Sequence, residues 1–217
     1  MRKYCILFLS LFFLVACDDF LSVKPKAEIV EHVYFDTPEG FEDALYGAYS
    51  TLSASALYGE HLSWGLLDVF AQYYKKNSIN DNVKSMLILE HEKLRSYYNL
   101  IWNKGYETIG YVNNVLRNLE RKSENSMHYY KLYKGEALGL RAYLHFDLLR
   151  LFAPHVGSKP NAQGIPYVTI YEVAVSPFKT VSEVYDLVIK DLKEAELLLQ
   201  EDETLLVYPR KFVLNDG

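Results

Sequence analysis

Residues 129–152, YYKLYKGEALGLRAYLHFDLLRLF, constrain the fold more than any other part of the chain. Apolar side chains recur here every three or four residues, the spacing of one face of an α-helix. They form two adjacent stripes: Leu132, Ala137, Leu140, Leu144, Leu148 and Leu151 in the first, and Leu138, Ala142, Phe146 and Leu149 in the second. A helix that is apolar over so much of its circumference must be covered on more than one side, so we expect other helices to pack around it. Pro154 ends it, because the residue before a proline is forced out of the helical conformation.

Two polar side chains on this helix stand among apolar neighbours. Arg141 lies between Leu140 and Ala142, so we expect at least half of it to be covered. A covered guanidinium needs an acidic or carbonyl partner, and the simplest interpretation is a structural ion pair in a helical core. We expect His145 to be a packed, hydrogen-bonded histidine and not a metal ligand.

Length and charge limit the class of protein. The chain has 217 residues, half of them hydrophobic, which is enough for one domain with a core and too few for two of ordinary size. Its formal charge of -5 is spread along the sequence without a basic run. Proteins that bind nucleic acid need clustered Lys and Arg to neutralise phosphates, so nucleic acid is not an expected partner.

The N-terminus carries the pattern of a lipoprotein signal peptide. A short positive n-region is followed by an apolar h-region over residues 6–15 and by the lipobox LVAC, which ends at Cys17. We expect residues 1–16 to be a signal peptide, Cys17 to be lipidated, and residues 17–36 to tether the folded body to the membrane. The alternative is a plain secretory peptide with an incidental cysteine. Cleavage after residue 16 also removes Cys5, so no thiol would remain for a disulfide, a metal site or a nucleophile.

Four further segments are predicted to be helical from their periodicity and their start and stop signals. They are 37–58, which begins at Thr37-Pro38 and ends at Tyr58-Gly59; 64–74; 90–119, which contains Gly105 and Gly110; and 180–199, which opens with a capping box of Thr180 and Glu183. We expect the two glycines to weaken their helix or to let another helix come close. The predicted inward side of the last helix consists of Val184, Tyr185, Val188, Ile189, Leu192, Ala195, Leu198 and Leu199.

The expected fold is therefore all-α: an antiparallel helical array over residues 37–217, with irregular loops and one short extended piece at 165–169. Taken in order, these segments resemble the SusD family, also called SusD/RagB. The resemblance rests on residues 17–21 (CDDFL), 97–119, 135–152, 164–168 (GIPYV) and 180–199.

The resemblance implies tetratricopeptide-like helix pairs in a surface-exposed, glycan-binding lipoprotein of the Bacteroidetes outer membrane. Such proteins serve polysaccharide utilisation. They bind an oligosaccharide or polysaccharide without cleaving it and act as a lid on a SusC-like TonB-dependent transporter. Family members continue well beyond Gly217, so the chain resembles the N-terminal half of such a protein, truncated at its C-terminus.

Sugar binding needs flat aromatic faces for the C–H side of a pyranose and planar polar groups for its hydroxyls. Most of the 19 tyrosines, and Trp102, lie at helical spacing in apolar stripes, so we expect them in the core. The candidate ligand-binding residues lie in or beside the polar run 75–82: Trp64, Asp68, Gln72, Tyr73, Tyr74, Asn77, Asn80 and Asn82. Asp68 and Gln72, four residues apart, are expected on one side of the 64–74 helix. The alternative is that the run is only a solvated loop.

No catalytic motif is visible in the sequence. HExxH, GxSxG, a phosphate loop and a dinucleotide fingerprint are all missing, and no carboxylate pair can be placed as a glycosidase requires. We interpret the protein as non-catalytic, without cofactor or metal. Three functions stay open: a glycan-binding lipoprotein, a truncated helical-repeat adaptor that binds only protein partners, and an outer-membrane glycosidase lipoprotein.

Overall fold

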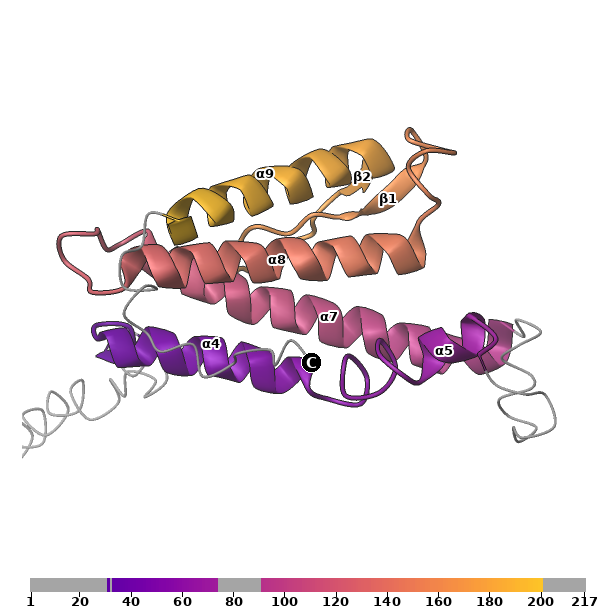
Figure 1. The fold of residues 1–217 in the computed structure, drawn as a ribbon, viewed down its shortest axis with the longest axis horizontal. Coiled ribbons are helices and arrows are strands. Elements are labelled where there is room, and N and C mark those ends of the chain that lie inside the picture. The colour runs from indigo at the N-terminus through magenta and orange to yellow at the C-terminus, as the bar shows by residue number, and fades with distance from the viewer. Residues whose placement is uncertain (1–30, 32, 74–90, 201–217) are drawn as a thin grey trace, which may run out of the picture. The chain divides into compact units, whose positions relative to one another are not determined.

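A computed structural model describes residue 31 and residues 33–73 and 91–200 (Figure 1). The chain divides into two compact units, residues 1–37 and 38–217, and every element below belongs to the second. These elements are α4 (Pro38–Leu52), α5 (Leu66–Phe70), α7 (His91–Leu119), α8 (Tyr130–Phe152), β1 (Gln163–Pro166), β2 (Phe178–Thr180) and α9 (Val181–Gln200). The predicted all-α character is confirmed, whereas the pairing of helices into tetratricopeptide-like repeats remains an expectation. The predicted signal peptide and Cys17 lie outside the described residues.

The centre of the unit is α8, as the sequence predicts. It packs against α9 and α7, and α7 packs in turn against α4 (Figure 1). Residues of both apolar stripes are buried, among them Leu138, Leu144 and Leu149. The helix begins one residue later than predicted, because Tyr129 has a left-handed backbone with φ 63°. In the described part of the chain no helix is both long and apolar enough to cross a membrane.

The start of α9 confirms the predicted capping box. The Glu183 carboxylate accepts hydrogen bonds from the Thr180 backbone N–H (2.7 Å) and hydroxyl (2.8 Å), and the Glu183 N–H donates to Thr180 Oγ1 (3.3 Å). The prediction for the inward face was wrong at Ile189 and Leu192, whose side chains are about half exposed. A buried polar residue, Asp191, lies on the packed face instead.

The helix predicted over 37–58 is shorter in the structure. It begins at Pro38 as expected but ends at Leu52 and not at Tyr58. Hydroxyl side chains compete with the backbone bonds of the last turn: Thr51 Oγ1 donates to the carbonyl of Gly47 (3.0 Å) and Ser53 Oγ to that of Ser50 (2.7 Å). Residues 53–64 then form consecutive turns, and the Tyr58 N–H donates to the carbonyl of Leu52 (3.0 Å).

The two glycines of α7 behave differently. A Cβ at Gly105 would lie 3.0 Å from Leu148 Cδ2 on α8, so the predicted close approach of a second helix is confirmed there. A Cβ at Gly110 would meet nothing within 4 Å. Among residues 33–73 and 91–200, no helix therefore packs closely against α7 at Gly110.

A small antiparallel sheet joins α8 to α9. Gln163 of β1 pairs with Thr180 of β2 and Pro166 with Phe178, with an irregular register between them. The extended piece predicted at 165–169 overlaps β1, but its pairing with β2 was not predicted. A strand of three residues is too short for its alternation to be read from sequence.

Candidate functional site

The predicted glycan-binding residues are only partly described by the structure. Tyr74, Asn77, Asn80 and Asn82 lie outside the described residues. Trp64 and Tyr73 are well exposed, at 60% and 81% of their surfaces, while Asp68 is half-buried. The exposed aromatic faces meet one requirement for sugar stacking.

The predicted placement of Asp68 and Gln72 on one helical face was wrong. Helix α5 has only five residues and ends at Phe70. Gln72 has a left-handed backbone with φ 58°, and the Tyr73 N–H donates to the carbonyl of Asp68 (3.1 Å). The chain turns sharply here, so the four-residue spacing does not bring the two side chains onto one side.

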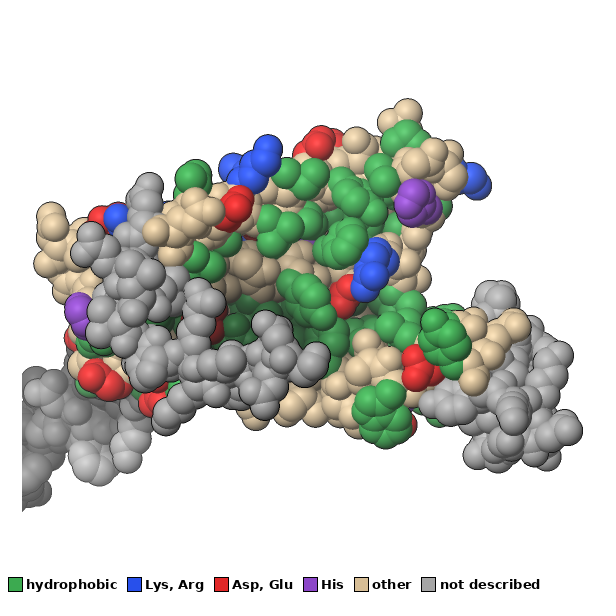
Figure 2. All heavy atoms as spheres, viewed as in Figure 1, with side chains coloured by type: hydrophobic (Ala, Val, Ile, Leu, Met, Phe, Trp, Pro, Cys, Tyr) green, Lys and Arg blue, Asp and Glu red, His purple; other side chains and the backbone are tan. Residues whose placement is uncertain are grey.

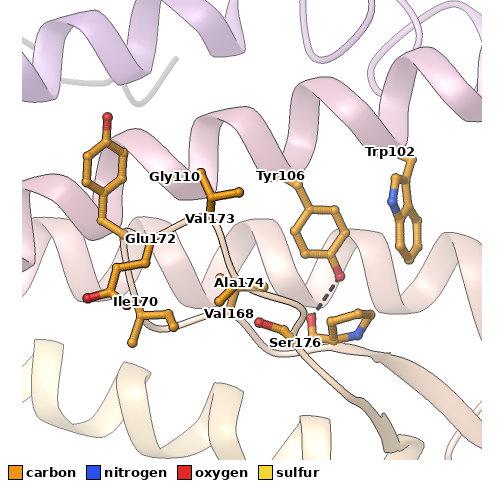
Figure 3. Close-up of a pocket in the computed structure, with 11 residues that line it drawn as sticks. Trp102, Tyr106, Gly110, Val168, Ile170, Glu172, Val173, Ala174 and Ser176 are labelled. Atoms are coloured by element: carbon orange, nitrogen blue, oxygen red, sulfur yellow. Dashed lines mark hydrogen bonds between the residues drawn. The ribbon is translucent and has the colours of Figure 1, made fainter.

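A cavity of about 530 Å³ lies between α7 and residues 166–176, the connection from β1 to β2 (Figure 3). This volume falls in the range of about 300–1,000 Å³ that is usual for ligand sites. Most of its lining is apolar or aromatic, with one carboxylate and one serine hydroxyl besides two tyrosines: Trp102, Tyr106, Gly110, Pro166, Val168, Ile170, Tyr171, Glu172, Val173, Ala174 and Ser176.

Trp102, expected in the core, is half-buried and lines this cavity. Its ring centroid lies 4.9 Å from that of Phe152 in an edge-on contact and 4.8 Å from that of Tyr106. It also stacks on Phe178 at 6.3 Å. The indole of Trp102 is therefore partly buried, as expected, and its remaining surface faces the cavity.

The wall of the cavity rests on a buried ion pair. Arg141 donates to both oxygens of Asp191, from Nε to Oδ2 (2.7 Å) and from Nη2 to Oδ1 (3.0 Å). Both residues are more than 90% buried, so the structural ion pair predicted for Arg141 is confirmed. The pair joins α8 to α9.

Asn113 connects this ion pair to the cavity wall. Its Oδ1 accepts a hydrogen bond from Arg141 Nη1 (3.2 Å), and its Nδ2 donates to the carbonyls of Val168 (2.9 Å) and Ile170 (3.4 Å). One buried amide on α7 thus satisfies a guanidinium from α8 and holds two carbonyls of the connecting segment.

His145 binds the same segment from α8. The Val168 N–H donates to His145 Nε2 (3.0 Å), and Nδ1 lies 2.8 Å from the carbonyl of Arg141. Since Nε2 accepts, the ring proton is on Nδ1, which donates to that carbonyl. Burial lowers the pKa of His145 from 6.5 to about 4, with a smaller contribution from the Arg141 charge, so the ring is neutral at pH 7. The predicted packed, hydrogen-bonded histidine is confirmed.

Two tyrosine hydroxyls complete the network. Tyr106 donates to the carbonyl of Pro166 (2.8 Å), as Figure 3 shows, and Tyr167 donates to Asp191 Oδ2 (2.6 Å). Burial raises the pKa of both phenols above the ordinary value, so both remain protonated donors. Residues 166–170 are therefore held from α7, α8 and α9 together.

Neither this cavity nor its supports were predicted from the sequence. Asn113 is one of several polar residues in a long helical pattern, and its acceptors lie 55 and 57 residues further along the chain. A weak signal did exist. The segment between the predicted loop and the last helix contains three aliphatic residues, Ile170, Val173 and Val175. A connection without function would be polar.

Comparison with known proteins gives a match over almost the whole chain. A family model described as "Starch-binding associating with outer membrane" matches residues 19–212. The chain is also similar to SusD-like protein P38 of Formosa agariphila, with 27% identity over 204 residues that make up 88% of this chain and 36% of that relative. The chain thus spans about a third of the length of the curated relative. No solved structure gives a significant match. The chain belongs to the SusD-like family, as its resemblance to SusD/RagB proteins predicted.

Proposed function

We propose that the chain binds glycan at the cell surface as an outer-membrane lipoprotein and works with a SusC-like TonB-dependent transporter. The observation that carries this proposal is the match to a starch-binding, outer-membrane family over residues 19–212. The lipobox ending at Cys17 supports a lipid anchor, because acyl chains are attached through that thiol. Binding is the activity that the family description names, which agrees with the non-catalytic interpretation.

The proposed glycan surface is the stretch 64–82. Trp64 and Tyr73 supply exposed aromatic faces, and Asp68 and Gln72 supply a carboxylate and an amide for sugar hydroxyls. Tyr74, Asn77, Asn80 and Asn82 belong to the proposed set on their sequence alone. A sugar held by such an open platform would bind weakly, in the millimolar range that corresponds to about -4 kcal/mol.

One observation favours the second candidate, an adaptor that binds only protein partners. Helix α9 exposes Ile189, Leu192 and Leu197, between 45% and 59% of each side chain. Figure 2 shows hydrophobic side chains in the region of α8 and α9, with Lys, Arg, Asp and Glu side chains beside them. Exposed apolar surface of this kind is characteristic of contacts between proteins.

Affinity electrophoresis of the full chain in native gels that contain starch or other polysaccharides separates these functions. Glycan binding predicts retardation in at least one polysaccharide gel. A Trp64→Ala/Tyr73→Ala variant should lose most of that retardation, whereas Tyr46→Ala, which removes an exposed tyrosine from α4, should keep it. Normal migration in every gel would leave the adaptor as the better account. Release of reducing sugar from a polysaccharide that retards the protein would instead support the glycosidase hypothesis.

A further inference from the structure

The cavity between α7 and residues 166–176 contains a fixed aromatic surface outside the proposed 64–82 stretch. The rings of Tyr106, Phe152 and Phe178 all contact the Trp102 indole. These contacts fix the orientation of the ring, and its uncovered part lines the cavity. A preorganised aromatic face binds a flat ligand at a smaller entropic cost than a mobile one.

Two polar side chains of the cavity, those of Glu172 and Ser176, have no partner in the part of the chain that the structure describes. Among the residues that the structure describes, the Glu172 carboxylate and the Ser176 hydroxyl make neither a hydrogen bond nor an ion pair. In Figure 3, Ser176 lies beneath Tyr106, and Glu172 lies at the opposite end of the lining from Trp102. The Tyr106 hydroxyl is already engaged by Pro166. Hydrogen-bonding capacity is therefore available from Glu172 and Ser176 at two separated points along a cavity whose other side chains are apolar or aromatic.

The length of the cavity exceeds that of a single sugar ring. Its lining on α7 runs from Trp102 to Gly110, eight residues, which corresponds to about 12 Å at 1.5 Å per residue. Glu172 is the only charged side chain among the described residues of the lining. A carboxylate accepts hydrogen bonds from neutral sugars and repels anionic ones, so the charge favours an uncharged ligand.

We propose that this cavity is a second glycan-binding site, which takes a short stretch of a neutral oligosaccharide with one ring stacked on Trp102. Sugar hydroxyls bond to Ser176 and Glu172, and the aliphatic lining contacts the C–H faces. The bonds from Asn113 and His145 to Val168 and Ile170 hold the first part of this wall in place before the ligand arrives. The inference rests on the proposed glycan binding and adds a site to it.

The two tryptophans of the sequence allow each site to be observed separately. The full chain is labelled with [15N-indole]tryptophan and titrated with maltoheptaose, a neutral α-glucan fragment of starch, to about 20 mM. A Trp64→Phe variant assigns the two indole N–H signals. We expect both signals to shift. A shift of the Trp64 signal alone overturns the cavity site and leaves the proposed function intact, whereas no shift of either signal counts against both.

Two helical glycines provide a matched pair of variants. Gly110→Leu places a side chain in the cavity without a backbone clash, because a Cβ at Gly110 meets nothing within 4 Å. Gly47→Leu makes the same change at an equally open position on α4. Filling the cavity should weaken the maltoheptaose response of Trp102 at least tenfold, and the Gly47 variant should retain it. If Gly110→Leu does not fold, Ser176→Leu narrows the same cavity from the opposite wall. An unchanged Trp102 response in the folded variant contradicts the proposal.

Discussion

The two ring nitrogens of His145 link the central helix to the wall of the cavity. Nδ1 binds the carbonyl of Arg141 within α8, and Nε2 binds the N–H of Val168 in the connecting segment. Protonation of Nε2 would remove the acceptor for Val168 and place a second positive charge beside Arg141. The fold thus depends on a neutral His145, and burial, which lowers its pKa to about 4, keeps it neutral.

This dependence predicts the direction of a pH effect on stability. Between pH 6.5 and about 4 the unfolded chain binds a proton at His145 that the folded chain does not bind, so stability falls as the pH is lowered through this range. A difference of about 2.5 pKa units corresponds to roughly 3 kcal/mol. Urea denaturation at pH 7 and pH 4 should show a smaller loss for His145→Asn than for the wild type. Equal losses in the two proteins would mean that His145 is not the responsible group.

Cys17 carries the prediction for membrane attachment. Cys17→Ala removes the thiol to which diacylglycerol would be attached, so the variant should incorporate no lipid. Incorporation of radiolabelled palmitate in cells measures this directly. Label retained at the wild-type level in the variant would refute the lipoprotein interpretation.

At the scale of elements, α8 is attached to α9 by two ion pairs of different character. Arg141 and Asp191 are both buried, whereas Lys134 and Glu194, 3.0 Å apart, keep about a third or more of their side chains exposed. Removing one partner of a buried pair leaves an uncompensated charge in the core, while a surface pair is screened by solvent.

We therefore expect Asp191→Ala to lower the free energy of unfolding by about 3–5 kcal/mol. Glu194→Ala, on the same helix, should lower it by less than about 1 kcal/mol. Urea denaturation of both variants provides the comparison. Similar losses for the two would show that the Arg141–Asp191 pair does not hold α8 and α9 together.

The glycines of α7 give a second comparison within one element. Gly110→Ala should stabilise the protein by up to about 1 kcal/mol, because alanine favours the helix and its Cβ meets nothing. Gly105→Ala should be less stable than Gly110→Ala by roughly 1–3 kcal/mol, because its Cβ would press on buried Leu148. Thermal melts of the two variants measure the difference. The opposite order would mean that α7 and α8 are not in close contact at Gly105.

At the scale of the whole molecule, the sequence predicted what local periodicity determines. The position of α8, the capping box at Thr180 and the covering of Arg141 all follow from side chains within a few residues of one another, whereas the partner of Arg141, Asp191, lies 50 residues away and was not predicted. Ile189 and Leu192 were misassigned because an apolar helical stripe shows which residues could be buried and not which ones are covered. The early end of α4 depends on hydroxyl groups that compete with its last turn.

The cavity could not be predicted because its two walls come from distant parts of the sequence. Residues 102–110 and 166–176 are brought together by Asn113, His145 and Tyr106, whose bonding partners lie 23 to 60 residues away. No local pattern encodes those pairs. The family resemblance, by contrast, rests on the order of several ordinary segments, and the match over residues 19–212 confirms it.

The central claim is that this chain binds a glycan without cleaving it. Isothermal titration calorimetry of the full chain tests it most directly. The ligand is maltoheptaose, or an oligosaccharide prepared from a polysaccharide that retards the protein in native gels. We expect heat of binding with a Kd in the millimolar range, about -4 kcal/mol, and no hydrolysis of the ligand recovered afterwards. The absence of binding heat at ligand concentrations of about 20 mM, or a recovered ligand that has been shortened, would contradict it.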